Sequence, residues 1–149
     1  MSDRIEKSIT LRAPQSRVWR ALTDYQQFNQ WFHVALTGPF VEGRVTEGHI
    51  TYEGYEHFRF HAHVVKLDPE RYFAYRWHPY PDPPEIVGSD EPMTLVEFTL
   101  EPVPEGTLLR VVESGFDKLP AHRRAKAFEM NEGGWEAQLE NIAEYVHGA

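Results

Sequence analysis

Two glutamates carry the strongest chemical signal in this sequence, because each falls among apolar residues. Glu113 alternates with Val111 on the inward phase of a predicted strand, and Glu132 falls between Phe128 and Trp135 on the apolar face of a predicted helix. An acid in an apolar interior is costly unless it is paired or hydrated. We therefore predict that both carboxylates face one interior, where they hold the polar end of a ligand or act as acid and base. The alternative is that each pairs with an arginine or meets water at a cavity mouth.

Three histidines share one phase of a strand predicted over residues 55–67: His57, His61 and His63. A His-x-His pair on one strand face can chelate zinc or copper. The sequence offers no carboxylate partner at a matching position, so we predict a solvated face and no metal site. Val65 and Leu67 continue the histidine phase, which suggests that a β-bulge switches the faces. The pattern leaves open which face of this strand lines a cavity.

Aromatic residues make up 13% of the chain and must line a core or a pocket. Phe73, Tyr75 and Trp77 share one face of a predicted strand. For any single ring, core packing is the simpler interpretation. As a set, the rings predict a cavity wall for an apolar or aromatic ligand. With the two glutamates, the predicted ligand-binding residues are Phe28, Trp31, Phe32, Phe73, Tyr75, Trp77, Phe98, Glu113, Phe128, Glu132 and Trp135.

Composition excludes several classes of protein. The 149 residues suit a single domain over residues 1–149. The 23 acidic and 15 basic residues give a net charge of −8, which argues against nucleic-acid binding and against docking on an anionic membrane. The absence of cysteine excludes disulfides and thiolate sites. The sequence shows no apolar leader or membrane span, which predicts a cytoplasmic protein.

The sequence contains none of the common catalytic signatures. It has no nucleophile elbow, no phosphate-binding glycine loop and no His-Glu-x-x-His helix. We therefore assign no catalytic residue and predict no cofactor.

The elements that must position these residues are segregated along the chain. A strand is predicted over residues 5–12, and short helices over 14–24 and 25–32. Further strands are predicted over residues 40–45, 49–52, 55–67, 72–77, 93–101 and 108–114. Residues 78–92 contain five prolines and are predicted to form a loop at a rim. A helix of about seven turns follows Pro120; it contains Gly133-Gly134, for which we expect a close approach or a bend.

This order favours an α+β fold, in which a curved antiparallel sheet packs against one long helix. A gap between sheet and helix is a common place for a small molecule.

Three segments in this order, spanning nearly the whole chain, form a recognisable set. They are Ala13-Pro14 with residues 18–24 and Trp31-Phe32, then residues 106–116, and then Gly133-Gly134-Trp135 with Leu139, Ile142 and Tyr145. The set resembles the START-like (SRPBCC) superfamily, and within it the branch named after the activator of the heat-shock-protein-90 ATPase. The resemblance implies a helix-grip fold: a curved antiparallel sheet wrapped around a long C-terminal helix, with two short helices after the first strand. It also implies an apolar cavity between sheet and helix.

Members of that superfamily carry lipids, hormones or polyketides, and a few are cyclases or hydrolases. The leading hypothesis is a noncatalytic binding protein for a hydrophobic or aromatic small molecule. One alternative is a cyclase- or hydrolase-type enzyme that uses cavity carboxylates, and another is a protein-interaction domain of the co-chaperone type. The sequence does not name the ligand or the pathway, and it leaves the oligomeric state open, a homodimer included.

Overall fold

The computed structural model describes residues 3–148, whose strands form one six-stranded antiparallel sheet in the order β1-β6-β5-β4-β3-β2. The strands are β1 (Arg4–Leu11), β2 (Val45–His49), β3 (Arg59–Asp68), β4 (Tyr72–Trp77), β5 (Thr94–Val103) and β6 (Gly106–Ser114). The first strand pairs with the last, so β1 and β2 lie at opposite edges of the sheet. The chain crosses between these edges through two short helices.

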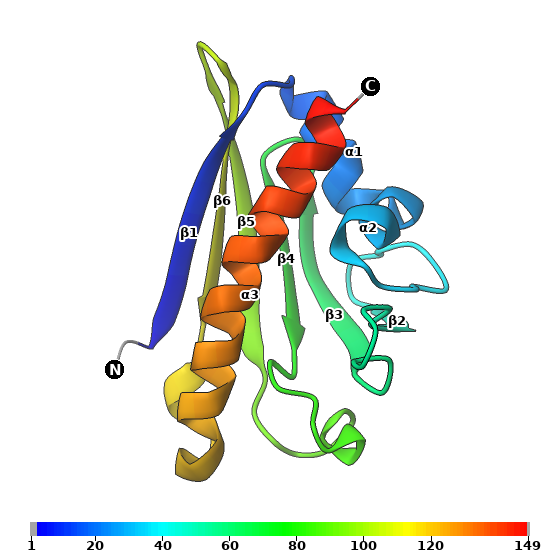
Figure 1. Cartoon of the computed structure of the whole chain (residues 1–149), viewed down its shortest axis with the longest axis vertical. Helices are drawn as coiled ribbons and strands as arrows, with labels where there is room; N and C mark the ends of the chain where they lie inside the picture. The colour runs from blue at the N-terminus through cyan, green and yellow to red at the C-terminus, as the bar shows by residue number, and fades with distance from the viewer. Residues whose placement is uncertain (1–2, 149) are drawn as a thin grey trace.

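Those helices are α1 (Gln15–Thr23) and α2 (Tyr25–Phe32), and the long C-terminal helix is α3 (Ala121–His147). Asp24 separates the short helices, and its carboxylate accepts a hydrogen bond from the Gln26 backbone N–H at the start of α2. Figure 1 shows α3 lying diagonally across one face of the sheet, with α1 and α2 beside it. The prediction of an α+β helix-grip fold is confirmed. Within residues 3–148, no helix is long and apolar enough to cross a lipid bilayer.

The core lies between α3 and the covered face of the sheet. Along β5 and β6, buried residues alternate with partly exposed ones, as the period of a half-buried strand requires. In the register of this pair, Phe98 lies opposite Val111 and Val96 lies opposite Glu113. The alternation that buries Val111 therefore also turns the Glu113 side chain into the core, as predicted.

The predicted long strand over residues 55–67 is wrong in its first part. Residues 50–58 form two successive turns, closed by hydrogen bonds from Tyr55 N–H to the Tyr52 carbonyl and from Phe58 N–H to the Tyr55 carbonyl. Gly54 has φ of +90°, a backbone conformation that favours glycine and interrupts an extended strand. The strands predicted over residues 40–45 and 49–52 are replaced by the single strand β2, and β3 begins only at Arg59.

The predicted bulge in β3 is confirmed, because the register with β4 shifts between Val64 and Lys66. Before the bulge, Phe60, Ala62 and Val64 are buried; after it, Val65 is exposed. The sheet face that packs on α3 is therefore reached by Phe60 and not by the histidines.

Gly133 and Gly134 lie inside α3, which continues through them without interruption. No atom lies within 4 Å of a methyl group placed on either glycine, apart from the backbone of the helix itself. The expectation of a close approach at this pair is therefore wrong. By contrast, Gly106 has φ of +145°, and a methyl group there would lie 2.2 Å from the Leu11 carbonyl oxygen.

We expect Gly133→Ala to raise the free energy of unfolding by about 0.5–1 kcal/mol, because alanine loses less backbone entropy in a helix and has open space here. Gly106→Ala should act in the opposite direction, through strain and overlap with the backbone. Urea denaturation followed by circular dichroism measures both variants. A loss of stability in Gly133→Ala would indicate a packing role for this glycine that the structure does not explain.

Candidate functional site

A pocket of about 360 Å³ lies between the middle of α3 and the sheet. Met130, Gly134 and Gln138 follow one another at intervals of four residues, so they present one stripe of α3 to the pocket, and Asn131 and Trp135 lie beside it. The remaining lining comes from α2, from the neighbouring ends of β3 and β4, and from two loops, residues 50–58 and 78–81.

Four aromatic side chains of this lining form what we term the aromatic wall: Phe32, Phe60, Trp77 and Trp135. The ring centroids of Phe60 and Trp77 are 5.3 Å apart, and those of Trp77 and Trp135 are 5.8 Å apart. Phe32 contacts the rest of the wall, with its ring centroid 5.5 Å from Phe60 and 6.1 Å from Trp135. The pocket therefore has a continuous apolar surface contributed by α2, β3, β4 and α3.

Behind this wall, Glu113 accepts hydrogen bonds from four side chains. Its Oε2 accepts from Trp77 Nε1 at 2.8 Å and from the Thr94 hydroxyl at 2.5 Å. Its Oε1 accepts from Trp135 Nε1 at 2.8 Å, and the Asn131 amide nitrogen lies 2.9 Å from Oε1 and 3.1 Å from Oε2. Both oxygens are therefore occupied by donors from β4, β5 and α3, and Glu113 itself is not part of the pocket lining.

No cation forms an ion pair with Glu113 among residues 3–148, although its side chain is completely buried. Burial raises the pKa of Glu113, and the hydrogen bonds from Thr94, Trp77, Trp135 and Asn131 oppose this effect. The prediction that Glu113 is a buried acid in the interior is confirmed. The hydrogen bonds also show its structural role, which is to fix two indoles and one amide of the pocket lining.

Tyr75 reaches the same region of the interior from β4. It is fully buried, and its hydroxyl has no hydrogen-bond partner in the part of the chain that the structure describes. Burial, and after it the Glu113 carboxylate, raises the pKa of Tyr75 well above its ordinary value. The side chain is therefore a neutral phenol with an unsatisfied polar atom.

The mouth of the pocket is formed by the 50–58 loop, from which Tyr52 and Tyr55 protrude as exposed aromatic residues. The Tyr52 hydroxyl accepts a hydrogen bond from the Asn141 side chain of α3 at 2.8 Å, and the Tyr52 ring stacks on His33 with centroids 4.4 Å apart. These contacts attach the loop to α2 and α3. Two exposed charged residues, Glu53 and Arg59, also line the pocket here.

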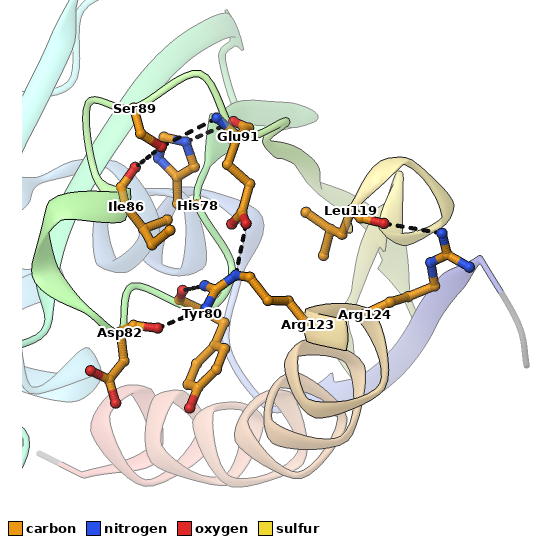
Figure 2. Close-up of polar contacts among 9 residues, drawn as sticks. All are labelled: His78, Tyr80, Asp82, Ile86, Ser89, Glu91, Leu119, Arg123 and Arg124. Carbon is orange, nitrogen blue, oxygen red and sulfur yellow. Dashed lines mark hydrogen bonds and ion pairs between the residues drawn. The ribbon is translucent and has the colours of Figure 1, made fainter. Parts of the chain in front are cut away.

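The opposite rim is the 78–92 loop, which Arg123 of α3 holds in place (Figure 2). The guanidinium donates to the backbone carbonyls of Asp82, at 2.8 Å, and of Tyr80, and it lies over the Tyr80 ring. Its Nε forms an ion pair with the Glu91 carboxylate at 2.7 Å. Glu91 also accepts through its backbone carbonyl from the imidazole of His78, 2.9 Å away. The proline-rich rim that supplies His78 to the pocket is therefore tied to the first turn of α3.

Most of the chain matches the model of one protein family. The model described as "Activator of Hsp90 ATPase homolog 1-like protein" matches residues 12–147. The chain belongs to this family. The resemblance seen in the sequence is thereby confirmed, and no curated protein sequence matches the chain significantly.

Solved structures share the fold of this family member. MLL2253 from Mesorhizobium loti aligns with a TM-score of 0.75 and 24% identity, covering 97% of this chain and 96% of that protein. The Aha1 dimer from Colwellia psychrerythraea aligns with a TM-score of 0.72 and 20% identity, covering 98% of this chain and 96% of that protein. DynU16, described as a putative protein in the dynemicin biosynthetic locus, aligns with a TM-score of 0.74 and 23% identity over 99% of this chain. The present chain spans about half (48%) of the length of DynU16.

The nine aromatic residues predicted to bind ligand fall into three groups in this family member. Phe32, Trp77 and Trp135 line the pocket. Five others are buried in the core and do not line it: Phe28, Trp31, Phe73, Tyr75 and Phe98. Phe128 is partly buried and packs edge-to-face on Phe116, away from the pocket lining. The rings are thus divided between core and pocket, and nothing in their type separates the two groups.

The prediction that Glu132 points into the interior is wrong, because this side chain is exposed. The buried stripe in this part of α3 runs through Ala127, Asn131 and Trp135 at intervals of four residues. The large ring of Phe128 suggested the neighbouring phase, which would have buried Glu132. Asn131 takes the inward position instead, and its amide donates to Glu113.

Two functional elements escaped the sequence analysis. The strands predicted over residues 49–52 and 55–67 include Tyr52 and Tyr55, so the sequence did not predict that both lie in one loop. Arg123 carried a signal that could have been used: a cation in the first turn of a helix is unfavourable with the helix dipole. Such a residue is expected to have a specific partner, here the Glu91 carboxylate and two carbonyls.

The three histidines do not converge. His57 is exposed before β3, and His61 and His63 lie on the face of β3 that points away from the core. His61 Nδ1 lies 4.0 Å from the Glu47 carboxylate, and burial lowers the pKa of His61. Among residues 3–148, no three His, Asp or Glu side chains are grouped so that they could hold a metal ion.

We expect Glu113→Gln to lower the free energy of unfolding by about 1–3 kcal/mol, because an amide NH₂ replaces an acceptor oxygen and leaves a buried donor such as Trp77 Nε1 without a partner. Urea denaturation at neutral pH measures this loss. Unchanged stability would contradict the role of the carboxylate as an acceptor for both indoles.

The same variant has a pH signature. Because the pKa of Glu113 is raised in the folded state, the native protein binds this proton more tightly than the unfolded chain does. The resulting stability is complete below the unfolded value of 4.5 and is lost as the pH rises through the folded value. The wild-type advantage over Glu113→Gln should therefore be larger at about pH 5 than at about pH 8. A reversed trend would place the folded pKa below the ordinary value.

Tyr75→Phe should raise the free energy of unfolding by about 1 kcal/mol, because it removes a buried hydroxyl that has no partner and keeps the ring. The comparison with Glu113→Gln, in the same denaturation assay, separates a satisfied buried polar group from an unsatisfied one. A marked loss of stability in Tyr75→Phe would mean that the hydroxyl has a partner, such as an ordered water.

Proposed function

We propose that this chain binds a hydrophobic or aromatic small molecule in the pocket between α3 and the sheet. The observation that carries the proposal is the aromatic wall facing a pocket of about 360 Å³. Small-molecule sites have volumes of about 300–1,000 Å³ and mostly apolar linings, so this pocket is at the small end of the range. A compound with one or two rings suits it.

The affinity that this lining can supply is moderate. A ligand that buries about 300 Å² of apolar surface gains roughly 7 kcal/mol at 25 cal/mol per Å². The loss of translational and rotational freedom on association offsets part of this, which leaves an affinity on the order of micromolar. A carrier or sensor with reversible occupancy fits such a value.

The contacts of the acids support binding over acid–base catalysis. The enzyme alternative requires two carboxylates that reach a bound molecule. Glu113 has both oxygens occupied by donors behind the wall, and Glu132 is exposed. The co-chaperone alternative requires that the outer surface binds another protein. The Colwellia relative is described as a dimer, so the first measurement for this alternative is the mass of the present protein in solution, which shows whether it forms a dimer.

We expect Gly134→Leu to weaken binding of a small neutral fluorophore with two fused rings, 1-naphthylamine, by at least about tenfold. Gly134 lines the pocket between Met130 and Gln138, and its open surroundings let a larger side chain occupy the pocket without displacing the backbone. Fluorescence titration of wild-type protein should give about one site per chain.

Gly133→Leu is the matched control. Gly133 is the preceding residue of the same helix, has equally open surroundings and does not line the pocket. Its affinity for the fluorophore should remain within about twofold of wild type. Equal weakening in both variants would place the bound fluorophore elsewhere, and absence of binding to wild-type protein would refute the proposed function.

A further inference from the structure

The charges around the pocket are unequal in their exposure. At the mouth, Glu53 and Arg59 carry opposite charges and both are exposed to solvent. At the inner side, Glu113 is completely buried, and no cation pairs with it among residues 3–148. Solvent and salt screen the exposed pair, whereas a buried charge is screened much less. Glu113 is therefore the least screened charge beside the pocket that has no ion-pair partner among residues 3–148.

The donors around Glu113 are those expected for a carboxylate. An indole N–H can only donate, and one indole donates to each oxygen. Of the four partners, the two indoles and the Asn131 amide nitrogen donate, and only the Thr94 hydroxyl could accept a hydrogen from a protonated acid. These donors oppose the rise in the pKa of Glu113 that burial causes, and they favour a negative charge directly behind the aromatic wall.

The two indoles transmit this charge to the pocket. Trp77 and Trp135 direct their N–H groups at Glu113, and both residues line the pocket. Hydrogen bonding to an anion polarises the donor and makes the ring system more electron-rich. Tryptophan already has the most favourable ring face for a cation, and Phe32 and Phe60 add two more rings to the same wall.

The histidine in the pocket lining, His78, adds no opposing charge. Burial lowers the pKa of His78, and the backbone carbonyl and carboxylate of Glu91 only partly counteract this. His78 is therefore neutral at neutral pH and adds no positive charge to the lining.

From these contacts we infer that the pocket selects a cationic apolar ligand, such as an aromatic compound that carries a quaternary ammonium or protonated amine group. This inference rests on the proposed function and specifies its ligand class. The aromatic wall would surround the cationic head, and Glu113 would supply the charge complement without touching the ligand.

Three probes of nearly equal shape test this inference: phenyltrimethylammonium, tert-butylbenzene and benzenesulfonate. Each is a phenyl ring with one tetrahedral group, which is positive, neutral or negative. Titrations at about pH 8, in enough salt to screen exposed charges, can follow the indole N–H signals in ¹⁵N NMR spectra. We expect the cation to bind at least about tenfold more tightly than tert-butylbenzene, and the sulfonate to bind most weakly.

Two matched variants locate the source of this preference. Glu113→Gln should reduce the ratio of cation to neutral affinity by about tenfold, whereas Glu132→Gln, which removes an exposed carboxylate of α3 outside the pocket lining, should leave it within about twofold. If Glu113→Gln does not fold, the ranking of the three probes on wild-type protein still decides the question.

The outcomes separate the two proposals. Tighter binding of tert-butylbenzene or benzenesulfonate than of the cation would overturn the inference and leave the proposed function intact. Retention of the preference in Glu113→Gln, or its equal loss in Glu132→Gln, would also overturn it. Binding of none of the three probes would refute the proposed function together with the inference.

Discussion

A single buried carboxylate organises the interior of this protein. Glu113 of β6 receives hydrogen bonds from β4, β5 and α3, so it connects the sheet to the long helix at the inner side of the pocket. Burying a charge without a counter-ion is costly, and the arrangement is tolerable because both oxygens are fully provided with donors. Removing any one donor would leave the remaining structure with a less well compensated charge. The positions of Trp77, Asn131 and Trp135 are therefore linked to one another through one residue.

The pocket and the core are built from the same kinds of side chain. Phe28 stacks on Phe32 with ring centroids 4.7 Å apart, yet Phe28 is completely buried and Phe32 borders the pocket. The difference arises from the loops. Residues 50–58 and 78–92 extend beyond the sheet and surround a space that the rings do not fill. Their attachment to α2 and α3, through Tyr52 and Arg123, keeps that space bounded.

The sequence predicted the fold well because the fold depends on periodicity, which local residue order carries. Alternation placed Glu113 inward, and the break in alternation at Val65 indicated the bulge. The pocket was predicted less well, because its lining depends on how far each loop extends and on the rotation of α3. A shift of one residue in helix phase exchanged Asn131 for Glu132. Spacing alone could not settle that phase, since both alternatives place apolar residues on the inward face.

Two of the contacts by which Arg123 holds the pocket rim are made to backbone atoms of the rim. Arg123 holds the 78–92 loop through the carbonyl oxygens of Tyr80 and Asp82, which are main-chain groups that any amino acid supplies. Pro79 and Pro81, which line the pocket from the same loop, take no part in those hydrogen bonds. The side chains of this loop that line the pocket can therefore be exchanged while the support of the rim stays in place. The support of the rim is thus separate from its pocket-facing surface, and substitutions in that surface need not loosen the loop.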